Sequence, residues 1–86
     1  DPNYLRGIEL FNRGDYFAAH EVWEIPWRAA VGTDRWFYQS LIQAAVALYH
    51  LERGNSDGAG RLAARGRAKA VRCARTHLGL DLAEFW

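Results

Sequence analysis

The sequence predicts an all-α domain of four main helices, arranged as two antiparallel αα-hairpins with a short appendage over residues 80–86. Apolar residues recur at helical spacing, glycine-containing turns divide the chain, and no useful stretch alternates as a strand would. With 86 residues, 50% hydrophobic and 14% aromatic, the chain forms one domain and is too hydrophobic to be disordered. It is also too short for a nucleotide-binding α/β fold or a barrel.

The first helix is expected at the very start of the sequence. Asp1 is a good N-cap, and Pro2 suits the first helical position because its missing N–H would lack a partner there anyway. Apolar side chains then follow one helical face at Tyr4, Ile8 and Phe11.

The second helix is expected from Tyr16 to about Ala30. The Arg-Gly-Asp turn at 13–15 precedes it, with glycine ending the first helix and Asp15 capping the second. Pro26 interrupts the pattern and is expected to bend the helix, because it removes a backbone donor.

The third helix is expected over about 35–53, after a break at 32–34, and it is apolar nearly all round. Such a helix belongs in the centre of a bundle. A turn at 54–57 leads into a fourth helix over about 58–77, which Gly79 is expected to end.

The inward faces of these helices define the predicted core: Tyr4, Ile8, Phe11, Phe17, Trp23, Leu41, Ala44, Ala45 and Leu48. The whole of 1–86 is interpreted as a single domain. It lacks an initiator Met and ends abruptly at Trp86, so we expect a C-terminally trimmed fragment.

Two turns have similar sequences, Arg-Gly-Asp at 13–15 and Arg-Gly-Asn at 53–55, and each joins a pair of helices. One interpretation is a helical-repeat arrangement of stacked hairpins. The other is that any helix hairpin favours glycine and a capping residue at this place.

The densest polar and aromatic pattern lies in the second helix. His20 and Glu24 are one helical turn apart, and Trp23 and Trp27 flank them. Desolvation beside tryptophans perturbs protonation, so these residues are candidates for a site. The structural alternative is an ordinary helix ion pair between Glu24 and Arg28.

A polar line also runs along the third helix, at Gln39, Gln43 and His50. An antiparallel register about the intervening turn brings Gln43 level with His20 and Glu24, and leaves His50 about 7 Å further along the axis. We therefore expect His20, Glu24 and Gln43 to form one network beside Trp27.

The ligand types also allow a divalent metal site, with His20, Glu24 and His50 as candidates. The pattern departs from a zincin helix, which needs a second histidine where Glu24 stands. A di-iron bundle needs two Glu-x-x-His motifs, which the chain lacks. No cofactor is assigned.

The fourth helix carries a basic stripe, since residues 61–75 hold six basic and no acidic side chains. Its members are Arg61, Arg65, Lys69, Arg72 and Arg75. We expect this stripe to face solvent and not to bind nucleic acid specifically, because no exposed aromatic residue is clearly interleaved with it.

Two motifs are familiar: Gly7-x-x-Leu10-Phe11-Asn12-x-Gly14-x-Tyr16-Phe17-x-x-His20-Glu21-x-Trp23-Glu24-x-x-Trp27 and Leu41-Ile42-Gln43-x-Ala45-x-Ala47-x-Tyr49-His50. The chain thereby resembles a family of small all-helical prokaryotic proteins, domain of unknown function 309. The resemblance implies an all-helical domain of about this size, with no catalytic assignment. It also implies that five polar residues belong to one cluster: His20, Glu21, Glu24, Gln43 and His50.

Three functions remain open at this stage. The leading one is a binding module for a small molecule or peptide, whose candidate residues are His20, Glu21, Trp23, Glu24, Trp27, Gln43 and His50. The second is a hydrolase, metal-dependent or not, with Glu21 or Glu24 as general base. The third is a purely structural cluster.

Cysteine content, apolar run length and chain length indicate the compartment and assembly of the protein. A single cysteine, Cys73, excludes an internal disulfide and favours the reducing cytoplasm. The longest apolar run, Ala44–Tyr49, is far too short to span a membrane. At this size stability is marginal, so a homo-oligomer stays open.

Overall fold

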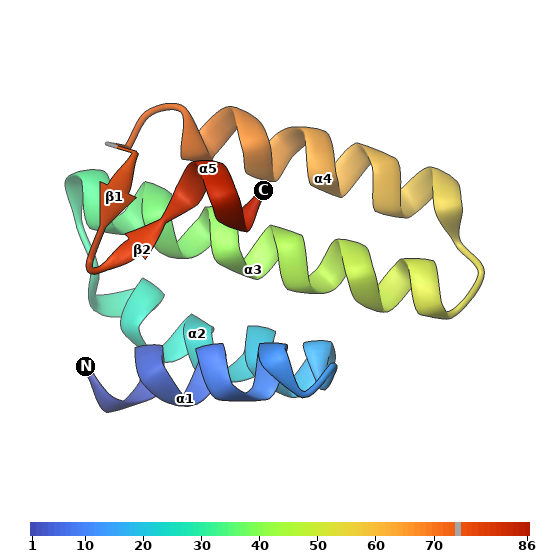
Figure 1. Cartoon of the computed structure of the whole chain (residues 1–86), viewed down its shortest axis with the longest axis horizontal. Coiled ribbons are helices and arrows are strands. Elements are labelled where there is room, and N and C mark those ends of the chain that lie inside the picture. The colour runs from blue at the N-terminus through green and yellow to red at the C-terminus, as the bar shows by residue number, and fades with distance from the viewer. Residues whose placement is uncertain (74) are drawn as a thin grey trace.

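The computed structural model describes residues 1–73 and 75–86. Its elements, in chain order, are α1 (Pro2–Asn12), α2 (Tyr16–Ala29), α3 (Gly32–Glu52), α4 (Ser56–Ala70), β1 (Thr76–His77), β2 (Leu80–Asp81) and α5 (Leu82–Phe85). Figure 1 shows two antiparallel pairs, α1 with α2 and α3 with α4, and α3 lies between α2 and α4. The predicted fold class is therefore confirmed.

The two turns that echo each other in the sequence have the same geometry. Gly14 and Gly54 adopt φ of 83° and 80°, and the next residue donates its N–H to the carbonyl five residues earlier. That next residue, Asp15 or Asn55, then caps the following helix by accepting a backbone N–H three residues on. Local turn chemistry is thus enough to explain the echo.

Trp23 joins the first two helices at the centre of the core. Its side chain is wholly buried, and its indole N–H donates to the Tyr4 carbonyl at 3.1 Å. Gly7 makes room for the ring, because a Cβ at this position would lie only 2.0 Å from the Trp23 Nε1 atom. The rings of Phe37 and Tyr38 pack against Tyr4 from α3.

Most of the predicted core is where the sequence placed it. Five of its members are buried: Tyr4, Trp23, Leu41, Ala44 and Ala45. Three others are half-buried: Ile8, Phe11 and Leu48. Phe17 was predicted wrongly, since it is 45% exposed and stacks between the rings of His20 and Tyr49 at the edge of the bundle.

The C-terminal third departs most from the prediction. Helix α4 ends at Ala70, not near His77, and a two-stranded hairpin follows where no strand was expected. Leu78 and Gly79 adopt φ of 49° and 81°, so Gly79 serves a two-residue hairpin turn and not a helix end. At its other end, α3 begins at Gly32, three residues before its predicted start.

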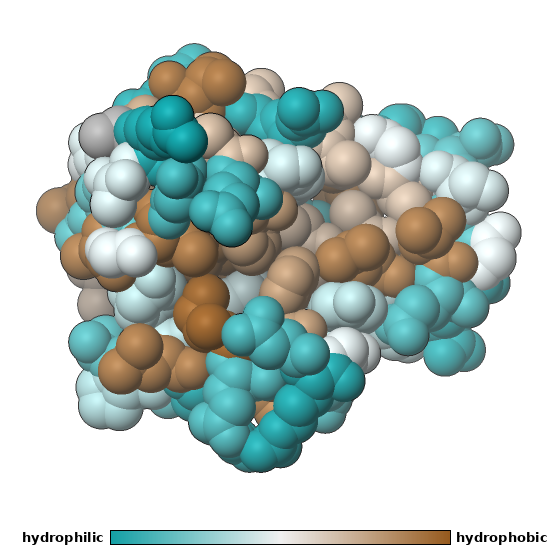
Figure 2. Space-filling model, in the orientation of Figure 1, coloured by the Kyte–Doolittle hydropathy of each residue, from teal (hydrophilic) through white to brown (hydrophobic). Residues whose placement is uncertain are grey.

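The segment after the hairpin is part of the core. Leu82 is 3% exposed, the Phe85 ring lies 5.1 Å from that of Phe11, and Trp86 Nε1 donates to Ser40 Oγ at 2.9 Å. In Figure 2 the strongly apolar residues of the visible face gather over α3, whereas α1 is mostly hydrophilic and α4 shows a mixture of hydrophilic and weakly apolar residues.

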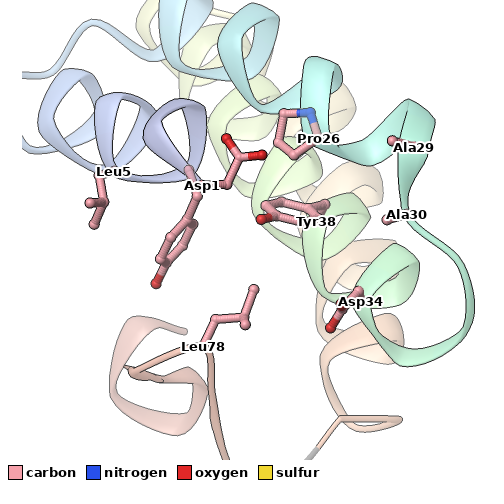
Figure 3. Close-up of a pocket in the computed structure, with 9 residues that line it drawn as sticks. Asp1, Leu5, Pro26, Ala29, Ala30, Asp34, Tyr38 and Leu78 are labelled. Atoms are coloured by element: carbon pink, nitrogen blue, oxygen red, sulfur yellow. The ribbon is translucent and has the colours of Figure 1, made fainter.

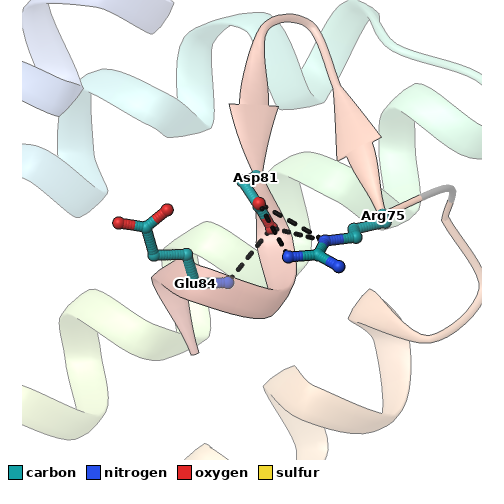
Figure 4. A network of polar contacts seen from close by, with 3 residues as sticks. All are labelled: Arg75, Asp81 and Glu84. Carbon is teal, nitrogen blue, oxygen red and sulfur yellow. Dashed lines mark hydrogen bonds and ion pairs between the residues drawn. The ribbon is translucent and has the colours of Figure 1, made fainter.

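Asp81 fixes the start of α5, as Figure 4 shows. Its carboxylate accepts the backbone N–H of Glu84 at 3.1 Å and pairs with the Arg75 guanidinium at 3.3 Å. The Glu84 N–H, with Arg75 second, holds the pKa of Asp81 below its ordinary value. The carboxylate therefore stabilises the end of the chain in its charged form.

Candidate functional site: a groove between α2, α3 and α4

A groove of about 220 Å³ opens where α2, α3 and α4 meet. Its aliphatic side chains are called here the floor, and its polar and aromatic ones the rim. Its lining residues are Glu24, Trp27, Gln39, Ile42, Gln43, Val46 and Leu62. Three of the predicted site residues, Glu24, Trp27 and Gln43, therefore meet at one place.

His20 and Glu24 form the predicted pair one turn apart on α2. His20 Nε2 lies 3.6 Å from Glu24 Oε1, and the two side chains are 18% and 34% exposed. The His20 Nδ1 atom hydrogen-bonds the Phe17 carbonyl. With its Nδ1 proton committed there, Nε2 carries a proton only in the imidazolium form, so contact with Glu24 is an ion pair when the ring is protonated.

Arg28 does not take the role that the structural alternative gave it. Among the described residues, the one ion-pair partner of Glu24 is His20. The carboxylate at the groove rim therefore has no Lys or Arg neutralising it, which leaves it able to accept a donor from a ligand.

Trp27, which lines the groove, carries an unsatisfied donor. Its buried Nε1 atom has no hydrogen-bond acceptor among the described residues. The Arg35 guanidinium lies over the ring, 4.2 Å from its centroid, and also donates to the Trp27 carbonyl at 3.2 Å. A buried N–H without an acceptor costs about 1–3 kcal/mol, so an acceptor that reached this atom would be favoured.

Gln43 has a partner that sequence reasoning did not name. Lys69 Nζ on α4 donates to Gln43 Oε1 at 2.9 Å, so the Gln43 carbonyl oxygen faces Lys69 while the residue lines the groove. Burial lowers the pKa of Lys69, and the nearby charges of Arg65 and Arg72 lower it further. In place of the expected three-residue network, the structure has two pairs at one groove, His20 with Glu24 and Gln43 with Lys69.

The other predicted site residues lie elsewhere. Trp23 is wholly buried and offers no surface to a ligand. Glu21 is exposed, and the described residues give it no hydrogen bond or ion pair. The ring of Tyr49, the residue before His50, contacts Phe17 near the start of α2. His50 therefore lies beyond the level of His20 and Glu24 along the axis of α3, in agreement with the register estimate.

The metal candidates do not gather. Among residues 1–73 and 75–86, no three His, Cys, Asp or Glu side chains form a group that could hold a metal ion. His20 and Glu24 are in contact, but in that part of the chain no hydrogen bond or ion pair joins His50 to either of them. The structure thus assigns His50 to no shared site with the pair.

Four residues of the groove were not committed to from the sequence: Gln39, Ile42, Val46 and Leu62. Gln39 belongs to the polar line of the third helix, and that line was its signal. Leu62 comes from α4, and its place depends on how α4 packs against α3, which no local pattern reveals.

A second, larger hollow of about 540 Å³ lies at the C-terminal end of α2. Figure 3 shows Leu5, Tyr38 and Leu78 reaching into it from α1, α3 and the hairpin turn. Burial raises the pKa of Tyr38, and the nearby Asp34 charge raises it further. The Asp34 carboxylate lies 2.7 Å from His77 Nε2, and this contact joins the hairpin to α3.

Fold and groove define a class of small helical domain, two αα-hairpins with a polar and aromatic groove where they meet. The chain belongs to the family described as Domain of unknown function (DUF309), whose profile matches residues 4–62. The match covers α1 to α3 and the start of α4, and therefore every lining residue of the groove.

Two bacterial relatives extend the comparison. The chain is similar to the uncharacterized protein YpuF of Bacillus subtilis, 39% identical over 77 residues, or 86% of this chain and 44% of that protein. It is also similar to an uncharacterized protein of Aquifex aeolicus, 28% identical over 76 residues, which is 87% of this chain and 23% of that protein. The chain spans less than half the length of these relatives, and no solved structure matches it.

A helix that crosses a membrane must be about 20 residues long and predominantly apolar. Within the described residues, none is both long and apolar enough to cross a membrane.

Proposed function

We propose that the domain is a peptide-binding module whose site is the groove between α2, α3 and α4. The observation that carries the proposal is one groove that joins an aliphatic floor to polar groups with unused bonding capacity. Apolar floors with a few convergent polar groups are typical of ligand sites. Cys73 supports a cytoplasmic location for this module.

The chemistry of the rim selects the ligand. A peptide backbone offers a carbonyl that can accept from the Trp27 indole N–H and an N–H that can donate to Glu24. An apolar side chain of the peptide would contact Ile42, Val46 and Leu62. Since the Glu24 carboxylate has no Lys or Arg partner in the described chain, a basic residue beside the apolar one is favoured.

Selection from a displayed library of random peptides tests the proposal. The expected result is enrichment of sequences that place an apolar residue next to Lys or Arg. Val46→Trp fills the groove with an indole and is expected to abolish binding of the selected peptides. Val71→Trp is the matched control, because Val71 is 82% exposed and lies outside the groove.

Glu24→Gln provides a milder variant that keeps the size of the side chain. Loss of a charge-assisted hydrogen bond costs about 1.5–3 kcal/mol, which weakens the affinity about 10-fold or more. Circular dichroism shows whether each variant is folded. If no peptide is enriched, or the selected peptides bind the Val46→Trp and Val71→Trp proteins equally, the groove is a structural feature and the proposal is wrong.

A further inference from the structure

The basic stripe of α4 lies beside an aromatic side chain that its sequence alone does not reveal. The Arg72 guanidinium lies 4.5 Å from the ring centroid of Trp36, which is 37% exposed on α3. From the sequence, specific nucleic-acid binding was not expected, because no exposed aromatic residue is clearly interleaved with the stripe. The packing of α3 against α4 supplies that residue.

The charges along this face are not neutralised within the described chain. Arg61, Arg65 and Arg72 are all exposed, and none of them is in an ion pair in the part that the structure describes. Lys69 lies near both Arg65 and Arg72 and is held by an uncharged partner, the Gln43 amide. A row of uncompensated cations thus runs along α4 and continues to Arg72, which lies just beyond the end of α4 and beside Trp36; the predicted stripe therefore does not lie on one helix, because Arg72 and Arg75 follow Ala70.

A hollow opens next to the same tryptophan. It measures about 290 Å³ and is lined by Gly32, Arg35, Trp36 and Gln39. The hollow therefore joins an aromatic ring, a guanidinium and an amide that both donates and accepts hydrogen bonds. These are the groups that hold an unpaired base, by stacking and by contacts with its edge.

From this juxtaposition we propose that the face formed by Arg65, Lys69, Arg72 and Trp36 binds single-stranded nucleic acid without sequence preference. Backbone phosphates lie along Arg65, Lys69 and Arg72, and one base stacks at Trp36 over the adjoining hollow. A duplex fits less well, because its bases are already stacked and cannot reach the indole. This face meets the peptide groove at Gln39, which lines both hollows, and at Gln43, which accepts from Lys69. None of the four residues of the face lines the groove itself, so the inference does not depend on the proposed function.

Fluorescence anisotropy with a labelled oligothymidylate of about 12 nucleotides, within the range of known single-strand sites, tests the inference. Binding is expected to saturate, to quench tryptophan fluorescence and to weaken with salt. Arg65→Gln and Arg72→Gln are each expected to reduce the slope of log affinity against log salt by about 0.7, the value for one single-strand phosphate. Arg13→Gln is the matched control, because Arg13 lies at the end of α1 and pairs with Glu9.

Stacking is tested separately from charge. Trp36→Leu is expected to weaken binding about 5- to 150-fold, whereas Trp36→Phe keeps an aromatic ring and restores most of the affinity. A duplex of equal length and heparin serve as competitors. The inference is overturned if the oligonucleotide does not bind at low salt, or if Arg13→Gln weakens binding as much as Arg72→Gln. It is also overturned if heparin and duplex compete equally while Trp36→Leu has no effect, because the face is then only a polyanion surface.

Discussion

Replacing Gly7 by alanine tests how closely α1 packs against the buried indole of Trp23. The new Cβ would lie 2.0 Å from Trp23 Nε1 and 2.4 Å from its Cδ1 atom. Because Trp23 is 0% exposed, the ring has no free space to enter, and α1 and α2 must separate. Its hydrogen bond to the Tyr4 carbonyl, now 3.1 Å, is then lost or stretched.

The magnitude follows from three contributions. Overpacking a core costs about 1–3 kcal/mol, and a buried donor left without its acceptor costs about 1–3 kcal/mol more. Alanine in place of glycine within a helix returns about 1 kcal/mol. We expect Gly7→Ala to lower the free energy of unfolding by about 3 kcal/mol, and the melting temperature by about 10–25 °C.

Urea and thermal unfolding, followed by far-UV circular dichroism, measure this loss. Gly60→Ala is the matched control, because Gly60 also lies inside a helix and has no neighbour within 4 Å of a built Cβ. This control is expected to gain about 0.5–1 kcal/mol. The reasoning is refuted if the two variants shift stability in the same direction or if Gly7→Ala unfolds like the wild type.

Three further predictions concern the core, the hairpin and the C-terminal contacts. Leu41→Ala is expected to cost about 2–5 kcal/mol and Phe17→Ala less than about 1.5 kcal/mol, since only Leu41 is wholly buried; equal losses in urea unfolding would contradict the burial of these two side chains. Leu78→Asn is expected to raise the melting temperature, because asparagine tolerates the positive φ of 49° better than leucine does; an unchanged or lower value would argue against strain at this turn. The pKa of Asp81 is lowered in the folded state, so its stabilising effect is present at neutral pH and is lost as the pH falls below about 4. Tryptophan fluorescence during acid titration should show that Asp81→Asn reduces this loss, and an unchanged acid transition would contradict it.

The helices were predictable because their ends carry strong local signals. Asp1, Asp15 and Asn55 each accept a backbone N–H as N-caps, and glycine follows α1 and α3 in the conformation that ends a helix. The start of α3 was missed because Val31 precedes it and gives no side-chain cap. Where a helix lacks its capping residue, its boundary is set by packing.

The C-terminal hairpin could not be read from the sequence. Each strand has only two residues, too few to show alternation. Leucine is also an unusual residue for the first position of a turn that needs positive φ. Contacts far away in the chain hold this segment, including the bond from Trp86 to Ser40.

The groove was predictable in part. The spacing on one helix showed that His20 and Glu24 meet, and the register about a turn brought Gln43 to the same end of the bundle. The contributions of α4 were not predictable, because the place of Lys69 and Leu62 depends on the packing of two long helices. Small shifts in that packing decide which side chains meet.

The indole resonance of Trp27 gives the most direct test of the peptide groove. In a ¹⁵N-labelled sample titrated with a selected peptide, this resonance is expected to shift in a saturable way, because its N–H gains an acceptor. The indole resonances of Trp23 and Trp86 are not expected to shift, since both N–H groups already donate within the protein. Trp27→Phe assigns the peak. A Trp27 resonance that does not move while the peptide binds would contradict the groove as the peptide site.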